Sequence, residues 1–151
     1  MRNITNYYIG NRENLISNRE SYITGNKFRI SVLSPRLIRI EYNEKGLFED
    51  RATSLVINRL FPKFNYSIVE SETMIEVNTG IFTLTYVKDS PIKSNVLSSN
   101  IKAVLNGTDI EWQFNNPEAK NLRGINYSID SIKDKIILDK GLYSLDGFCV
   151  L

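Results

Sequence analysis

The sequence lacks histidine altogether, since none occurs among its 151 residues. This absence excludes Ser-His-Asp and Cys-His nucleophile pairs and every histidine-ligated metal site. It also leaves no side chain whose unperturbed pKa lies near neutrality. Catalysis by this chain alone would therefore have to rest on carboxylates, lysines or tyrosines.

Cysteine and long apolar runs are also scarce. Cys149 is the only cysteine, which excludes an internal disulfide and leaves too few ligands for a structural zinc. Its apolar neighbours predict a small buried residue at this position. The apolar runs are far shorter than the ~20 residues that span a bilayer, and the first residues lack the apolar core of a signal peptide. We therefore expect a cytoplasmic protein with no membrane partner, no metal and no cofactor.

The chain has no long run of one charge sign. Its 19 lysines and arginines and 17 aspartates and glutamates are mixed along the sequence and give a formal net charge of +2. Because a surface that follows a phosphate backbone usually carries a basic stripe, we do not expect nucleic acid as a partner. With 42% hydrophobic residues, the chain is long enough for a single domain, residues 1–151, with a substantial core.

The pattern that is present is strand-like alternation. Apolar side chains at every second position share one face in residues 28–32 and 37–42, namely Phe28, Ile30, Val32, Ile38, Ile40 and Tyr42. Further short strands are expected at residues 54–58, 66–71, 74–78, 81–87, 101–105 and 109–114. Nothing resembles a long amphipathic helix. Many short strands separated by turn residues predict an all-β fold, an antiparallel sandwich or barrel.

Three connections complete this outline. Asn106-Gly107 lies between two predicted strands and is the strongest hairpin signal in the chain. Residues 1–20 are polar and weakly patterned, which is typical of a ragged lead-in or an edge strand. Residues 115–131 are expected to form a long crossing loop.

A charged cluster, Glu49-Asp50-Arg51, follows the second predicted strand. Neighbours in an extended chain point to opposite faces, so the two carboxylates are poorly placed to face each other across a sugar. We expect a structural corner, in which these charges pair with one another, with Arg36 or Arg59, or with another domain.

Aromatic residues allow two interpretations. Trp112 and the tyrosines are suited to a stacking platform for sugars, and equally to the interior of a sandwich. Trp112 alternates with Ile110 and Phe114 as a core residue does, so the core is favoured for Trp112. Loop tyrosines such as Tyr143 remain open to either role.

Several short motifs resemble one known family. They are "PRLIR" at residues 35–39, "FEDR" at 48–51, "NRLFP" at 58–62, "NLRGINYSID" at 121–130 and "LDKGLYSLDGFCVL" at 138–151. Together they are similar to segments from the N-terminal part of glycoside hydrolase family 31, the α-glucosidase and α-xylosidase family. The chain departs from the family's usual residues at Arg123, Ile125, Leu145 and Phe148, where glycine, threonine, arginine and tryptophan are common.

The resemblance implies a β-sandwich of the galactose-mutarotase-like type, or supersandwich, placed before a catalytic (β/α)₈ barrel. In the family, two aspartates on the barrel carry out a retaining hydrolysis of terminal α-glycosidic bonds. A barrel needs roughly 250 residues, so it is expected downstream and absent from this chain. The chain itself is then non-catalytic, and its partners are that barrel and, through the whole enzyme, α-linked glucosides or oligosaccharides. Aldose epimerases of this fold use histidine, so mutarotase activity is not expected.

The resemblance also assigns roles to residues. Asp146 and Tyr143 in the closing segment are candidates for sugar contact, although Asp146-Gly147 is equally well explained as a plain turn. A second group is expected to act in structure or in docking to the barrel: Arg36, Glu49, Asp50, Arg51 and Arg59. The alternative functions are an independent carbohydrate-binding module and, with less support, a structural adhesion sandwich.

Overall fold

The computed structural model describes residues 12–51, 56–92, 99–113, 120–124, 130, 132–138 and 143–150. Two short 3₁₀ helices come first, η1 (Arg12–Leu15) and η2 (Arg19–Ser21). The strands that follow in the described part are β1 (Tyr22–Thr24), β2 (Phe28–Ser34), β3 (Leu37–Tyr42), β4 (Ser67–Glu70), β5 (Met74–Asn78), β6 (Phe82–Val87), β7 (Ser99–Leu105) and β8 (Thr108–Gln113).

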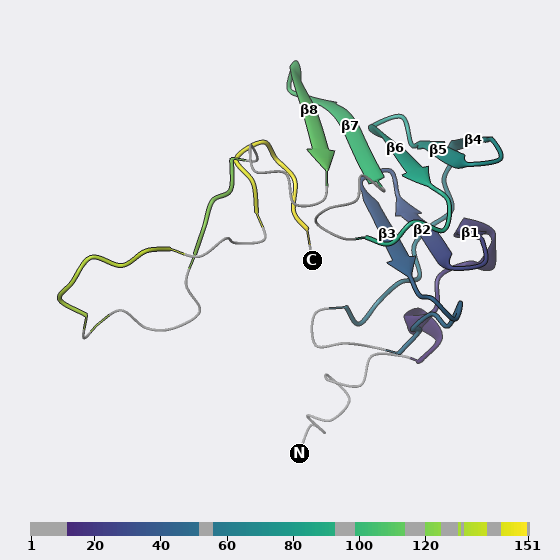
Figure 1. Cartoon of the computed structure of the whole chain (residues 1–151), viewed down its shortest axis with the longest axis horizontal. Coiled ribbons are helices and arrows are strands. Elements are labelled where there is room, and N and C mark those ends of the chain that lie inside the picture. Colours follow the sequence, from purple (N-terminus) through teal and green to yellow (C-terminus); the bar gives the residue numbers. More distant parts are fainter. Residues whose placement is uncertain are drawn as a thin grey trace.

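The strands form two antiparallel sheets (Figure 1). One sheet has the order β1-β2-β3 and the other the order β4-β5-β6-β7-β8, so each strand pairs with its neighbour in sequence. Such consecutive pairing needs only short turns, which suits the closely spaced turn residues of the sequence. The predicted all-β, antiparallel fold is confirmed, with two sheets that pack on a common core.

The core lies between β2 of the smaller sheet and β5 and β6 of the larger one. Seven side chains form it: Phe28, Ile30, Val32, Ile75, Val77, Leu84 and Tyr86. They occupy alternate positions of their strands, because successive side chains of a strand point to opposite faces. The alternation read from the sequence therefore identified the core-facing residues of β2 correctly, and β5 and β6 show the same period.

Tyr86 brings a polar group into this core. Its ring is fully buried and lies 5.1 Å from the Phe28 ring, centroid to centroid. Its hydroxyl donates a hydrogen bond of 2.6 Å to the Ser90 carbonyl, so the buried oxygen is satisfied. Burial, with a smaller effect from the charge of Asp89, raises the pKa of Tyr86 to about 12. The side chain thus stays neutral throughout the physiological range.

The hairpin expected at Asn106-Gly107 is present between β7 and β8. Leu105 pairs with Thr108, and the two loop residues have φ angles of 52° and 77°. Positive φ at both positions is the signature of a type I′ turn, whose twist matches that of the flanking strands. This explains the sequence preference for asparagine followed by glycine.

The strand pattern differs from the sequence-based expectation at two places. Residues 56–58 of the strand predicted at 54–58 lie outside any strand, and the remaining residues of that prediction lie outside the described part. Strand β1, only three residues long, was not predicted; it forms the edge of the smaller sheet after the 3₁₀ helices. Its side chains are half-buried or exposed, so its sequence carries little alternation.

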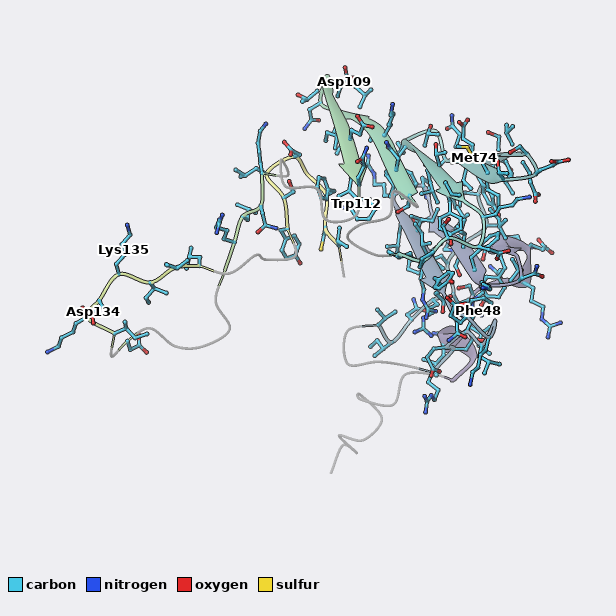
Figure 2. All side chains as sticks on the ribbon, viewed as in Figure 1. Phe48, Met74, Asp109, Trp112, Asp134 and Lys135 are labelled. Carbon is cyan, nitrogen blue, oxygen red and sulfur yellow. The ribbon has the colours of Figure 1, made fainter. Side chains whose placement is uncertain are left out.

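Trp112 lies in β8 and is half-buried rather than fully enclosed (Figure 2). It pairs with Ile101 of β7, and Ile110, two positions earlier in β8, is buried. Ile110 and Trp112 share one face of the strand, as the alternation predicted. Because the larger sheet has five strands and the smaller sheet only three, the smaller sheet does not cover the whole of the larger one. Strand β8, at the end of the larger sheet, therefore lies at the margin of the core.

The last described segments extend from the sheets as an arm (Figure 1). Residues 132–138 form its far part, with Asp134 and Lys135 at the end (Figure 2). The closing segment, residues 143–150, is tied to the base of the arm by a bridge between Asn121 and Ser144. Exposed apolar side chains are frequent here, and Ile137 is 84% exposed.

Cys149 belongs to this closing segment and is exposed, so the prediction of a small buried residue is wrong. It pairs with Tyr143 in an isolated bridge rather than in a sheet covered by a second layer.

In the part of the chain that the structure describes, no helix has the length and apolar character to cross a membrane.

Candidate functional site

The charged corner is organised by Arg29, a residue that sequence reasoning missed. Arg29 lies on the face of β2 opposite the core, directly across from Glu41 of β3. Its Nε is 2.7 Å from Glu41 Oε2, and its Nη2 is 3.1 Å from Glu41 Oε1. The same Nη2 is 2.7 Å from Asp50 Oδ1. One guanidinium group thus binds two carboxylates from two segments.

Aromatic rings enclose this guanidinium group. The Arg29 Cζ atom lies 4.9 Å from the centroid of Tyr22 and 5.2 Å from that of Phe48. Both distances are within the range of cation–π attraction. Burial disfavours the charge of Arg29, yet the hydrogen bonds and charges of Glu41 and Asp50 outweigh it and raise the pKa of the arginine. Arg29 is therefore a permanently charged anchor beneath the corner.

The two carboxylates of the predicted corner, Glu49 and Asp50, contact different arginines. Glu49 pairs with Arg51, with 2.6 Å between Glu49 Oε2 and Arg51 Nη2, and the Glu49 carbonyl accepts a hydrogen bond of 2.8 Å from Arg39 Nη2. The hydrogen bonds from the Arg51 side chain and backbone lower the pKa of Glu49 to about 2. Asp50 turns inward to Arg29 instead. Both corner carboxylates are therefore held by arginines.

Arg59 and Arg36 occupy different places. Arg59 is only 2% exposed, and it donates hydrogen bonds of 3.0 Å to the carbonyls of Leu15 and Arg51. It therefore joins the N-terminal segment to the corner through backbone groups. Arg36 is exposed in the turn between β2 and β3, where its backbone N–H donates to Ser34 Oγ. Neither arginine forms a described ion pair with Glu49 or Asp50.

The closing segment contains the two candidates for sugar contact. Asp146 lies in a turn in which the Gly147 N–H donates to the Ser144 carbonyl at 3.1 Å, and Gly147 has a φ of 88°. Asp146 Oδ1 lies 3.2 Å from Lys120 Nζ, and its side chain is 22% exposed. Tyr143 is 60% exposed. The turn interpretation of Asp146-Gly147 is thus the observed local structure, and both candidates lie in one short segment.

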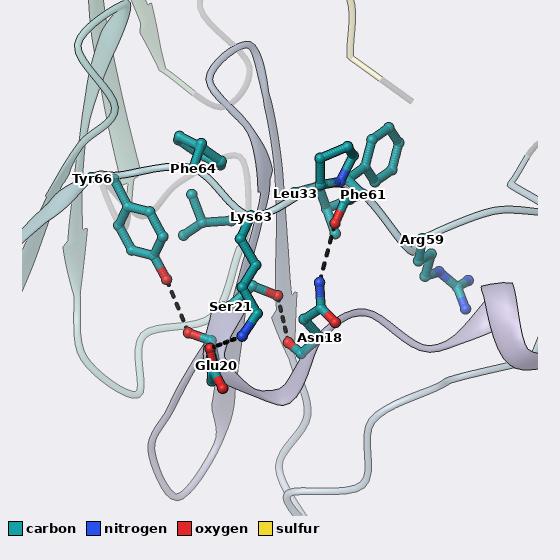
Figure 3. A pocket seen from close by; sticks show the side chains of 11 residues that line it. Asn18, Glu20, Ser21, Leu33, Arg59, Phe61, Lys63, Phe64 and Tyr66 are labelled. Carbon is teal, nitrogen blue, oxygen red and sulfur yellow. Dashed lines mark hydrogen bonds and ion pairs between the residues drawn. The ribbon is translucent and has the colours of Figure 1, made fainter.

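A pocket of about 110 Å³, which sequence reasoning missed, lies beside the smaller sheet (Figure 3). Its floor is formed by Val32 and Leu33 of β2. One wall is the turn of residues 18–21, and the other is the extended segment 59–66. The walls lie about 40 residues apart in sequence, so no local pattern indicates that they meet.

Three contacts hold the pocket walls together. Asn18 Nδ2 donates a hydrogen bond of 3.1 Å to the Phe61 carbonyl. Lys63 Nζ forms an ion pair with Glu20, and the Tyr66 hydroxyl donates to the Glu20 carbonyl at 3.1 Å. Burial, followed by the charge of Glu20, raises the pKa of Tyr66. The pocket is thus a fixed element of the fold, with its walls joined by polar contacts.

No metal centre is indicated in the part of the chain that the structure describes, where no three acidic or cysteine side chains are grouped suitably for an ion.

No family model matches the chain, and no curated protein matches it. The likeness to glycoside hydrolase family 31 therefore rests on the short motifs and remains a prediction.

Proposed function

We propose that the chain is the non-catalytic N-terminal domain of a retaining α-glucosidase-type glycoside hydrolase, a cytoplasmic enzyme of carbohydrate metabolism. In this proposal the two sheets belong to a sandwich of the galactose-mutarotase-like type. The domain supports a downstream (β/α)₈ barrel, and the barrel carries the two catalytic aspartates.

The observation that carries the proposal is the convergence of three motifs. Arg39 of "PRLIR" donates to the carbonyl of Glu49 in "FEDR". Arg59 of "NRLFP" donates to the carbonyl of Arg51 in the same corner. Residues that resemble the family at separate places in the sequence are therefore tied together on the outer face of the smaller sheet. A shared network gives a physical reason for these residue types to occur together in one chain.

The corner suits support rather than catalysis. A retaining glycosidase needs one carboxylate that is free to attack and one that can exchange a proton. Glu49 is bound by Arg51 and Asp50 by Arg29, so neither is available for these tasks. The chemistry is accordingly assigned to the barrel.

The closing segment is the proposed place of contact with the sugar pocket of the whole enzyme. Tyr143 supplies an exposed ring, and Asp146 supplies a carboxylate that can accept hydrogen bonds from sugar hydroxyls. Both residues lie in the last described segment, residues 143–150, which in this proposal precedes the barrel in sequence.

Hydrolysis by the complete gene product tests this function. The product of the full reading frame is expected to release nitrophenol from p-nitrophenyl α-D-glucopyranoside and to yield the α-anomer first, as followed by NMR. The 151-residue chain alone is expected to be inactive. Hydrolysis by the isolated chain, or an inverted product from the whole enzyme, would refute the proposal.

A variant tests the role of Asp146 in that enzyme. Asp146→Asn replaces the carboxylate that accepts hydrogen bonds from sugar hydroxyls in this proposal. We expect KM to rise by roughly tenfold with kcat little changed. Asp109→Asn, in the exposed start of β8, is the matched control and is expected to behave like the wild type. Equal KM values for the two variants would remove Asp146 from the sugar-binding residues.

An independent carbohydrate-binding module is the second candidate, and the exposure of Tyr143 favours it. Titration of the isolated chain with maltose or isomaltose, followed by tyrosine and tryptophan fluorescence, separates the two functions. A saturating response that Tyr143→Ala abolishes would support a binding module. A flat response, or a saturating response that Tyr143→Ala leaves unchanged, supports the positioning domain.

A further inference from the structure

The pocket between residues 18–21 and 59–66 has the features of a ligand site. Apolar groups form its interior, from Leu33 in the floor and the rings of Phe61 and Phe64 in the wall (Figure 3). Polar groups lie around them, chiefly the Asn18 amide and the charged ends of Glu20 and Lys63. An apolar interior with a few fixed polar groups is the usual composition of a small-molecule site.

The charges at the pocket favour a neutral ligand. Glu20 and Lys63 pair with each other, and their side chains are 76% and 66% exposed. A phosphate or another anion would meet the carboxylate of Glu20, and a cation would meet the ammonium group of Lys63. Hydroxyl groups, in contrast, both donate and accept hydrogen bonds, so they can bind either member of the pair.

The size of the pocket limits the ligand to a single ring. Its volume is about 110 Å³, and an enclosed cavity of roughly 150 Å³ accommodates benzene. A ring can therefore enter with one edge, while the rest stays outside. The aromatic residues suit a ring that has an apolar C–H face.

From these three features we infer that the pocket binds one neutral pyranose ring, at a place separate from the closing segment. The C–H face of the sugar packs on Phe61, and its hydroxyls bind Lys63, Glu20 and Asn18. The inference rests on the proposed function only in the choice of an α-glucoside as the ligand. It gives the domain a sugar contact of its own, remote from Tyr143 and Asp146.

Titration calorimetry of the 151-residue chain with methyl α-D-glucopyranoside tests the inference. The wild type is expected to give a saturable isotherm. Lys63→Met and Phe61→Ala are each expected to weaken binding by about tenfold, because one removes a charged hydrogen-bond donor and the other an apolar wall. Lys63→Arg retains a donor and is expected to bind within a few-fold of the wild type.

One variant serves as the control. Lys45→Met removes an exposed lysine that does not line the pocket, and it is expected to bind as the wild type does. Tyr143→Ala reports on the closing segment instead, because weaker binding in this variant would assign the sugar to that segment. Melting temperatures verify folding, and because Lys63 is exposed, its variant remains informative even if Phe61→Ala fails to fold.

Three results would overturn the inference: no saturation with the wild type, unchanged affinity in Lys63→Met, or weakening by Tyr143→Ala instead. These results are separable from those that concern the proposed function. Hydrolysis by the complete gene product does not require the pocket, so loss of pocket binding with retained hydrolysis would refute the inference alone.

Discussion

At the scale of single residues, Arg29 shows how a charge becomes structural. A basic residue at an alternate position of a strand usually marks the solvated face. Here the segment that carries Phe48 and Asp50 covers that face, and Arg29 is only 6% exposed. A local pattern cannot reveal coverage by a distant segment, which is why the sequence indicated the corner but not its anchor.

Replacing Arg29 with methionine is expected to lower the free energy of unfolding by about 2 kcal/mol. Glu41 would lose its most buried partner and keep only Arg39, whose Nη2 is 2.7 Å from Glu41 Oε1. The Glu41 side chain is 12% exposed, so little water can take the place of the guanidinium group. Urea denaturation measures the change. Lys27→Met is the control, since Lys27 and Glu44 form an exposed pair and such pairs contribute little. Equal effects of the two variants would contradict the role assigned to Arg29.

Glu49 gives the corner a dependence on pH. Its pKa in the fold is lowered to about 2, whereas an unfolded glutamate titrates near ~4.3. A lowered pKa means that the carboxylate stabilises the fold above the unfolded pKa, and that this contribution disappears as the pH falls toward the folded value. Because the group is exposed, the effect is small.

The measurement compares the melting temperatures of the wild type and Glu49→Gln at several pH values. The wild type is expected to melt higher at neutral pH, and the difference is expected to shrink below about pH 4. A difference that stays constant from neutral pH down to about pH 2.5 would show that the Glu49 charge does not stabilise the corner.

At the scale of elements, alternation and turn residues predicted most strands. The pairs of β5 with β6 and of β7 with β8 follow from apolar residues at every second position and from the intervening glycines. Strand β1 was missed because a three-residue edge strand has too few positions to show a period. The pocket was missed because its two walls are brought together only by the tertiary fold.

The β7–β8 hairpin offers a test of turn chemistry. Gly107 has a φ of 77°, and no neighbouring atom lies within 4 Å of the position that a Cβ would occupy, so a substitution there meets strain but no clash. Gly107→Ala is expected to cost about 1–2 kcal/mol, the usual penalty for a left-handed residue with a side chain. Gly124→Ala also enters open space, at a glycine without positive φ, and is the control. Equal stability of the two variants would argue against the turn type.

At the scale of the whole molecule, the sheets depend on each other. Ile30 of the smaller sheet and Leu84 of the larger one are both fully buried in the common core. Ile30→Ala is expected to lower stability by about 2–5 kcal/mol. The lower stability is expected to appear as one unfolding transition, at a lower denaturant concentration, in the fluorescence of Trp112, which reports on the larger sheet.

Ile68→Ala is the control for that experiment, because Ile68 of β4 is 44% exposed. Its transition is expected to lie close to that of the wild type. If Ile30→Ala left the Trp112 transition unchanged while another probe moved, the two sheets would unfold separately, and the common core would not unite them.

Function at this scale depends on whether the sandwich serves a catalytic barrel. The most direct measurement is to read the coding sequence that follows Leu151 in the native gene and to assay its product. The account predicts that the frame continues into a (β/α)₈ barrel with two separated catalytic aspartates and that the product hydrolyses α-glucosides with retention. A frame that ends at Leu151, or one that continues without such a barrel, would contradict it.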